Sequence, residues 1–321
     1  MSGLAPQTLA WPEIRERLST VDLLLAMERA FSAYSQGQAV IPPVGELQFS
    51  DPPGDVHIKY GYINGGRYYV VKIASGFYDN PVLGIPSSQG LMLLFEQETG
   101  RLASILLDEG RLTDERTGAA GAVAAKYLAP KEVHCIGIVG TGTQARCQLR
   151  HLKAVTPCRR VVVWGRNTAN TDAFCRDATN LEFDVEGVDS VAELARRANL
   201  VVTTTPTNTP LLQGAWIKPG THITAVGADA ASKQELASAI LSRADVVVVD
   251  SLQQSQHRGE VFQAVKSGEF QMDTAIELGQ VILGMKEGRT SDSQITVADL
   301  TGVAVQDLMI ASAIMTTDSS D

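Results

Sequence analysis

The pattern of apolar and polar residues changes near residue 130 of the chain. Before this point, the periodicity predicts helical structure over 12–36, a helix rich in small residues over 112–128, and strands between them at 56–63, 68–73 and 90–95. After it, helical segments alternate with apolar strands at 133–139, 160–164, 181–185, 199–204, 221–227 and 245–250. Such alternation is typical of a parallel, doubly wound sheet with helices on both faces.

Two domains follow from this change of pattern. With 321 residues, the chain is long enough to form two hydrophobic cores. We predict an α/β protein with a Rossmann domain over 128–302 and a smaller α+β domain over 1–127, completed by 303–321. The last 50 residues, through Ile295–Leu300 and a helix over about 302–315, can return to cover the smaller domain.

Capping residues predict where two of the helices begin. Ser19 or Thr20 can cap the second part of the first helical segment, because a hydroxyl there accepts from the helix backbone. Thr113 can cap the helix that is rich in small residues in the same way, which would place Arg116 at position N3.

The composition excludes several classes of partner. A net charge of -9, a pI of about 5.1 and the absence of a Lys/Arg run give no surface for nucleic acid or an anionic membrane. The 4 cysteines and 5 histidines show no ligand spacing, so we expect neither a disulfide framework nor a bound metal. No apolar stretch approaches the roughly 18 residues of a membrane span, and no signal-peptide pattern is present, so a cytoplasmic location is expected.

A glycine-rich turn follows the strand predicted over 133–139. Gly140 permits a tight turn, Gly142 lets the backbone approach a pyrophosphate, and Ala145 lets a helix pack closely on the strand. A turn of this kind can be purely structural, but the surrounding strand and helix favour a dinucleotide site at the helix N-terminus. The candidate cofactor residues in the turn are Gly140, Thr141, Gly142, Thr143, Gln144 and Ala145.

Further candidate cofactor residues stand at the ends of later strands. Arg166 occupies the region where an NAD-selective site usually has an acid, and an arginine there can contact a 2′-phosphate or stack on adenine. NAD is therefore expected, and NADP stays open. Thr204, Thr205, Val226 and Asp229 are expected on the nicotinamide side of the crevice.

Cationic residues in the first part of the chain suggest a binding site for a carboxylate. Lys59 and Lys72 each lie in an apolar strand, and Arg116 lies near a helix N-terminus. Together they can form a cationic pocket in which arginine binds a carboxylate through two parallel hydrogen bonds. The alternative for the lysines is an edge strand from which they reach solvent. Asp229 likewise fits a loop or capping residue as well as a catalytic one.

Five motifs are distributed along nearly the whole chain, namely Val71–Ile73, Leu112–Ala120, Gly140–Ala145, Gly220–Asp229 and Glu277–Gly284. Together they resemble the ornithine cyclodeaminase and mu-crystallin family. The family includes cyclodeaminases, ketimine reductases, and alanine and other amino acid dehydrogenases. Its members are usually dimeric through the substrate domain. The resemblance therefore implies a homodimer, with the smaller α+β domain serving for substrate binding and dimerisation.

The resemblance also implies roles for single residues. In the family, the lysine matching Lys72 and the arginine matching Arg116 hold the substrate's α-carboxylate, and in cyclodeaminases the aspartate matching Asp229 is the acid/base. Lys72 and Asp229 are therefore the candidate catalytic residues. The chain departs from the family at Val44–Glu46, where many members have an arginine, and at His57–Tyr60, where many have an apolar pair. Relative to those family members, one positive charge of the expected pocket is thus supplied from a different position in the chain.

The displaced cation indicates a small imino or amino acid substrate with two carboxylates. Lys59, with His57, would hold the β-carboxylate, and the variant motifs resemble the branch that contains iminosuccinate reductase and proteins of ectoine breakdown. We expect reduction of iminosuccinate to L-aspartate by hydride transfer from NAD(P)H. The alternatives are a cyclodeaminase, which is a lyase with recycled NAD, another ketimine reductase or alanine dehydrogenase, and a noncatalytic nicotinamide-binding protein.

Overall fold

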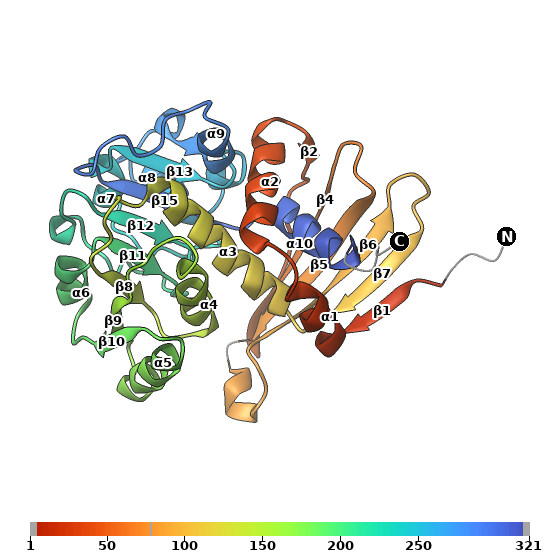
Figure 1. The fold of residues 1–321 in the computed structure, drawn as a ribbon, viewed down its shortest axis with the longest axis horizontal. Helices are drawn as coiled ribbons and strands as arrows, with labels where there is room; N and C mark the ends of the chain where they lie inside the picture. The colour runs from red at the N-terminus through yellow and green to blue at the C-terminus, as the bar shows by residue number, and fades with distance from the viewer. Residues whose placement is uncertain (1–4, 78, 317–321) are drawn as a thin grey trace. The chain divides into compact units, whose positions relative to one another are not determined.

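The computed structural model describes residues 5–77 and 79–316, which fall into two compact units (Figure 1). The first unit comprises Met1–Arg116 and Val303–Asp321, and the second comprises Thr117–Gly302. The boundary between them lies inside helix α3 (Arg111–Leu128), whereas the predicted boundary lies at the end of that helix. Residues 1–4 and 317–321, at the ends of the predicted ranges, lie outside the described residues.

A mixed sheet forms the base of the first unit. Its strands follow the order β1-β7-β6-β5-β4-β2, and β3 pairs with β4. The β1–β7 pair is parallel, and the other pairs are antiparallel. The strands are β1 (Gln7–Ala10), β2 (Ala39–Val40), β3 (Gly45–Ser50), β4 (Pro53–Ile63), β5 (Tyr68–Phe77), β6 (Ser88–Glu96) and β7 (Leu102–Leu107).

Three helices complete the first unit, namely α1 (Trp11–Leu18), α2 (Leu23–Ser35) and α10 (Ala304–Thr316). Helix α10 is the helix expected over about 302–315, and it packs against α2 and against strands β4, β5 and β6. Since sheet and helix cover it from two sides, α10 needs apolar residues around most of its circumference. Its buried apolar residues are Ala304, Val305, Leu308, Ile310, Ala311 and Ile314.

The second unit contains a fully parallel sheet, so the fold is the predicted doubly wound α/β fold. The strand order is β10-β9-β8-β11-β12-β15-β13-β14. Its apolar strands are buried on both faces, as expected for a parallel sheet between helices. The strands are β8 (Ile136–Val139), β9 (Arg160–Trp164), β10 (Asp184–Gly187), β11 (Leu200–Thr203), β12 (His222–Ala225), β13 (Val246–Val249), β14 (Ile276–Glu277) and β15 (Thr296–Asp299).

Helices form an apolar core on each face of this parallel sheet. Leu149 of α4 and Phe174 of α5 belong to one core, and Leu194 of α6 and Val261 of α8 belong to the other. The helices are α4 (Thr143–Leu152), α5 (Thr168–Asn180), α6 (Val191–Arg197), α7 (Ala239–Arg243), α8 (Gly259–Lys266) and α9 (Leu278–Ile282). Short 3₁₀ helices lie at Asn80–Leu83, Gly214–Trp216, Gln254–Gln256 and Met272–Thr274. Among the helices of the described chain, none combines the length and apolar character needed to cross a membrane.

The segment Ile295–Leu300, for which the sequence left a return to the smaller domain open, lies in the second unit, inside the predicted Rossmann range 128–302. Residues Thr296–Asp299 form β15, which is inserted between β12 and β13 in the sheet of the second unit. An apolar run of this length can pair with any nearby parallel sheet. Its register with β12 and β13 depends on tertiary contacts and not on the run itself. Only the helix that follows it belongs to the first unit.

Both predicted helix caps are wrong. Helix α2 is capped by Asp22, whose Oδ1 accepts from Leu25 N at 3.0 Å. Helix α3 begins at Arg111, and Asp108 Oδ2 accepts from Leu112 N at 2.9 Å. Aspartate caps as well as serine or threonine does, and in both helices an aspartate rather than a predicted hydroxyl residue makes this bond. Arg116 is consequently the 6th residue of α3.

Candidate active site

The predicted glycine-rich turn joins β8 to α4 in the second unit. Gly140 has a φ of 116°, and a Cβ atom there would collide with Thr204 Oγ1, so only glycine fits. Gly142, the N-cap of α4, has open space where a Cβ atom would lie, and Ala145 is fully buried. The first N–H groups of a helix lack intrahelical partners and attract an anion. The turn therefore fits a pyrophosphate; its partly or fully exposed side chains are Thr141, Thr143 and Gln144.

The adenosine side of a dinucleotide would lie along β9. Strand β8 stands between β9 and β11, where the strand order of the sheet reverses, and dinucleotides bind across such a point. Arg166 is exposed directly after β9, and the next residue, Asn167, caps α5 through a 3.1 Å bond from Asn170 N. An exposed guanidinium there can reach a 2′-phosphate or an adenine ring.

Glu235 holds the strand ends on the nicotinamide side together, a role that the sequence did not suggest. Its Oε1 accepts from Thr205 N at 2.5 Å and from Thr205 Oγ1 at 2.7 Å. Its Oε2 accepts from Thr203 Oγ1 at 2.8 Å and from Gly227 N at 2.7 Å. The buried carboxylate thus ties the end of β11 to the end of β12. Two other predicted cofactor residues lie in the same bonded region, since Thr204 Oγ1 and Val226 N donate to main-chain oxygens.

Three more buried acids lie among the loops of the second unit. Glu260 accepts from the backbone N–H groups of Glu235 and Leu236, at 2.7 and 3.1 Å. Asp299 accepts from Val261 N at 2.9 Å, and Asp250 accepts from Gly302 N at 2.6 Å. Burial raises the pKa of Glu260 and of Glu235, and it raises the pKa of Asp299 to about 7. These acids hold turns through their bonds to main-chain N–H groups.

Asp229, the candidate acid/base, lies half-buried in the loop after β12. Its Oδ1 is 2.6 Å from the ammonium group of Lys233, and its main-chain oxygen accepts from Arg258 at 3.2 Å. The loop thus presents a carboxyl group that is fixed at both its side chain and its backbone. The described residues contain no group of three His, Cys, Asp or Glu side chains that could hold a metal ion.

The first unit brings two of the predicted substrate residues together at one buried carboxylate. Lys72 Nζ lies 3.0 Å from Oδ1 and 2.9 Å from Oδ2 of Asp307, and Arg116 Nε lies 2.9 Å from Oδ1. All three side chains are at most 5% exposed. Asp307 is the residue of this cluster that the sequence reading missed. The signal that could have identified it is its position as a lone acid in the apolar helix α10. A buried acid of this kind requires a cationic partner.

Lys59 and His57 belong to the same face of the sheet. Lys59 pairs directly with Lys72 across the β4–β5 ladder, and His57 precedes it by two residues, so all three side chains point to one side. Lys59 is 6% exposed and His57 is 9% exposed. The alternative that the two lysines reach solvent is therefore wrong. His57 Nε2 lies 3.9 Å from Glu46 Oε1 on the neighbouring strand β3.

Burial and neighbouring charges set the protonation of this cluster. Burial lowers the pKa of Lys72 to about 8, with Arg116 acting in the same direction and Asp307 opposing it. Burial would raise the pKa of Asp307, but the charges of Arg116, Lys72 and Lys59 together hold it below its usual value. Asp307 is therefore ionised, and the three cations surround one anion. Such a cluster is suited to bind further negative charge.

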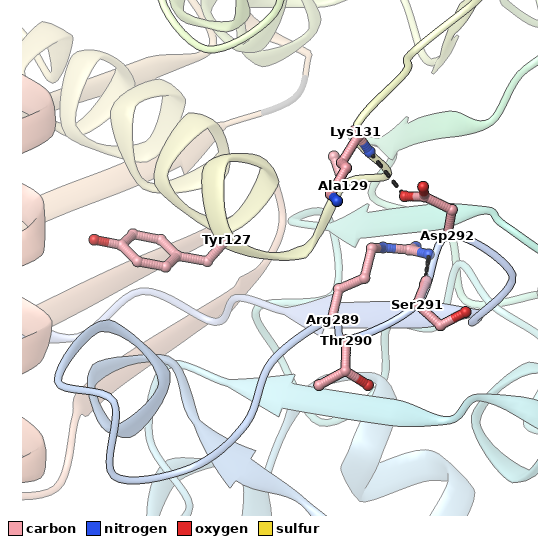
Figure 2. A pocket seen from close by; sticks show the side chains of 7 residues that line it. All are labelled: Tyr127, Ala129, Lys131, Arg289, Thr290, Ser291 and Asp292. Carbon is pink, nitrogen blue, oxygen red and sulfur yellow. Dashed lines mark hydrogen bonds between the residues drawn. The ribbon is translucent and has the colours of Figure 1, made fainter.

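A small cavity of about 140 Å³ lies elsewhere in the second unit (Figure 2). It is formed by the segments that precede β8 and β15, so it lies at the opposite end of the parallel strands from the glycine-rich turn. Arg289 crosses it and donates to the main-chain oxygens of Leu128 and Gln294, at 2.6 and 2.7 Å. This cavity contains none of the predicted site residues, and its lining is Tyr127, Ala129, Lys131, Arg289, Thr290, Ser291 and Asp292.

Comparisons with known proteins agree with the predicted family and fold. The sequence model of the ornithine cyclodeaminase/mu-crystallin family matches residues 7–320. An uncharacterised cyclodeaminase of Sinorhizobium fredii is 44% identical over 295 residues, which are 91% of this chain and 89% of that protein.

Two solved structures are similar over nearly their full lengths. An archaeal alanine dehydrogenase dimer with bound NAD has a TM-score of 0.89 and 34% identity, covering 97% of this chain and 95% of that one. The iminosuccinate reductase of Paracoccus denitrificans in complex with NAD⁺ has a TM-score of 0.87 and 30% identity, covering 97% and 96%. With the family match and these relatives, the chain belongs to the ornithine cyclodeaminase/mu-crystallin family.

Proposed function

We propose that this protein reduces an imino dicarboxylic acid, and that the substrate is iminosuccinate, which becomes L-aspartate. The broader class is an NAD(P)-dependent oxidoreductase that acts on C=N or CH–NH₂ groups. The observation that supports a dicarboxylate is the charge of the buried cluster. Lys59, Lys72 and Arg116 are three buried cations, and the charge of each lowers the pKa of Asp307. Buried cations at separate positions are suited to bind the two carboxylates of one substrate.

In this proposal each cation has a separate task. Lys72 and Arg116 bind the α-carboxylate. Both side chains bond to Asp307, so they lie close enough together to bind one carboxylate of the substrate. Lys59, assisted by His57, binds the β-carboxylate from the neighbouring strand. Asp229, or a water that it positions, delivers the proton to the imine nitrogen.

The second unit holds the cofactor. Gly140–Ala145 would hold the pyrophosphate, Arg166 the adenosine side, and Thr204, Thr205 and Val226 the nicotinamide side. When bound, NADH or NADPH supplies the hydride that the imine carbon accepts. The product carries one new C–H bond and, after protonation of nitrogen, an amine. Alignment of the two reactants provides most of the rate enhancement expected for such a transfer.

A cyclodeaminase is the second candidate, and the 44% identity with an uncharacterised cyclodeaminase favours it. Such an enzyme would take a diamino acid such as ornithine, whose side chain carries an ammonium group. That ammonium group would enter a cluster that already contains three cations, which is electrostatically unfavourable. The charge of the cluster therefore supports the dicarboxylate over the diamino acid.

We further propose that the protein is a homodimer formed through the first unit. The face of the sheet opposite Lys59 and Lys72 carries large apolar side chains that are exposed. Exposed apolar surface of this kind is typical of a subunit interface. The similar archaeal alanine dehydrogenase is a dimer. The exposed residues are Leu47, Phe49, Tyr60, Tyr62 and Ile73.

The test of the proposed function is a spectrophotometric screen of NADH and NADPH oxidation. Oxaloacetate with ammonia supplies iminosuccinate, pyruvate with ammonia supplies the matched monocarboxylate, and a cyclic ketimine tests the other reductases. We expect kcat/KM to be at least about tenfold higher with oxaloacetate and ammonia than with pyruvate and ammonia. Oxaloacetate without ammonia is the control. Equal or higher activity with pyruvate would refute the dicarboxylate, and ammonia release from ornithine without net cofactor turnover would establish a cyclodeaminase.

A further inference from the structure

Helix α10 contributes one charged side chain to the first unit, the fully enclosed Asp307. Its carboxylate bonds to Lys72 of β5 and to Arg116 of α3, so it joins three elements that are far apart in the sequence. In this buried position it is within hydrogen-bonding distance of both cations assigned to the α-carboxylate. It is thus placed to control both of them without touching the substrate.

The first effect of Asp307 concerns the charge of Lys72. Burial favours loss of the lysine proton, and the neighbouring guanidinium of Arg116 adds to this effect. The negative charge of Asp307 and its hydrogen bond are the main influences that oppose it. A neutral Lys72 amine would not attract a carboxylate. The binding strength of Lys72 therefore depends on its buried neighbour.

The second effect of Asp307 concerns the orientation of Arg116. Asp307 accepts from Nε at 2.9 Å, and Gln306 Oε1 accepts from Nη1 at 3.4 Å. A guanidinium group is planar, so two bonded nitrogens define its plane and the direction of its third nitrogen. Nη2 makes no hydrogen bond to the part of the chain that the structure describes. This nitrogen can therefore be presented to a ligand in one direction.

We propose that Asp307 is a positioning residue that keeps Lys72 charged and holds the Arg116 guanidinium in one orientation, so that both bind the substrate's α-carboxylate. This inference rests on the proposed function, because it takes the two cations as ligands of that carboxylate. Asp307 is assigned no contact with the substrate.

Asp108 offers a matched control within the same unit. It is 1% exposed, and its Oδ2 accepts from Leu112 N at the start of α3 rather than from a cation. Its charge influences Lys72 less than the charge of Asp307 does. Asp108→Asn therefore removes a buried carboxylate of the same chemistry and leaves the Asp307 bonds in place.

The test measures the titration of Lys72 by NMR in the full-length protein with ¹³C-labelled lysine, with the signal assigned through Lys72→Arg. In Asp307→Asn we expect the pKa of Lys72 to fall by at least about one unit. In Asp108→Asn we expect a change below about half a unit. Because charged Lys72 binds the carboxylate, the alkaline decline of kcat/KM should move to lower pH by the same amount. An unchanged Lys72 titration in Asp307→Asn would overturn the inference.

A second pair of variants covers the case in which Asp307→Asn does not fold. Lys59→Met combined with Asp307→Asn keeps the net charge of the cluster at its wild-type value, and Lys59→Met alone is its reference. The same fall in the pKa of Lys72 is expected between these two proteins, and no fall would overturn the inference. A further outcome is a wild-type protein that reduces no imino dicarboxylate while Asp307→Asn still lowers the pKa of Lys72. That result would refute the proposed substrate and support the control of Lys72 by Asp307.

Discussion

Lys59 and Lys72 occupy directly opposite positions in the antiparallel β4–β5 pair, and both are buried on the same face of the sheet. Like charges placed opposite each other destabilise a strand pair, and burial adds to that cost. Asp307 offsets part of it through its own charge. An arrangement that reduces stability in this way is expected to serve binding, and Lys59 is the lysine proposed to bind the β-carboxylate.

Lys59→Met removes the charge and keeps an unbranched, flexible side chain of similar shape. We expect kcat/KM for oxaloacetate with ammonia to fall about 10- to 100-fold, since a hydrogen bond to a charged group contributes about 1.5–3 kcal/mol. The value for pyruvate with ammonia should change less than about threefold. Lys59→Arg keeps the charge and is the control. Equal losses on both substrates would remove Lys59 from the β-carboxylate site.

The two glycines of the dinucleotide turn are expected to respond differently to alanine. Gly142→Ala places a methyl group in open space, so the melting temperature should stay unchanged while KM for NADH rises about tenfold. Gly140→Ala puts a side chain at a positive φ against Thr204, which should reduce the free energy of unfolding by at least about 1–2 kcal/mol. Thermal melts and cofactor titrations separate these effects. Normal NADH binding by Gly142→Ala would argue against a pyrophosphate at this position.

Asp229→Asn tests the proposed proton delivery. If the carboxylate serves the imine nitrogen, kcat should fall about 10²- to 10⁴-fold with little change in KM for NADH. Steady-state kinetics with both substrates varied provides the measurement. Lys233→Met, which removes the partner of Asp229 at 2.6 Å, is the companion variant and should alter the pH profile rather than abolish turnover. Full activity of Asp229→Asn would assign the proton to another donor.

Asp299 is expected to make stability depend on pH. Its pKa is about 7 in the folded protein and 3.8 in the reference state, so folded protein retains a proton that the unfolded chain loses in this window. The free energy of unfolding should therefore decrease as pH rises toward 7, by at most about 1.4 kcal/mol per unit. Asp299→Asn does not titrate at this position, so its decrease should be smaller, while Glu235 and Glu260, whose pKa values are also raised, still contribute. Urea unfolding of both proteins at several pH values measures it, and a difference that is independent of pH would contradict the assignment.

The proposed dimer can be tested at two exposed apolar residues. Ile73 lies on the exposed face of the sheet and is 37% exposed, and Leu25 lies on α2 and is 41% exposed. Ile73→Glu should convert the dimer to monomer, because a charge within an apolar interface is strongly unfavourable. Leu25→Glu should leave the mass unchanged. Light scattering after size-exclusion chromatography gives both masses, and a monomeric wild type would reject the dimer.

The sequence by itself determined those features that depend on neighbouring residues. The Gly140–Ala145 turn follows from a short run of glycines between a strand and a helix, and the alternation after residue 130 predicts the parallel sheet. These signals are local, because backbone conformation and side-chain periodicity act over a few residues. The cationic character of Lys59, Lys72 and Arg116 was also visible, as charges in otherwise apolar surroundings.

Only the tertiary structure decided which distant groups meet. Lys72 and Asp307 are 235 positions apart, and nothing near either residue indicates that helix α10 returns to this strand in the register that joins them. The same holds for Glu235, which reaches Thr203 and Gly227 from a loop without a periodic pattern. The protonation of Lys72 depends on both burial and its long-range partners, so the sequence predicts the cations, whereas the fold determines their charge and direction.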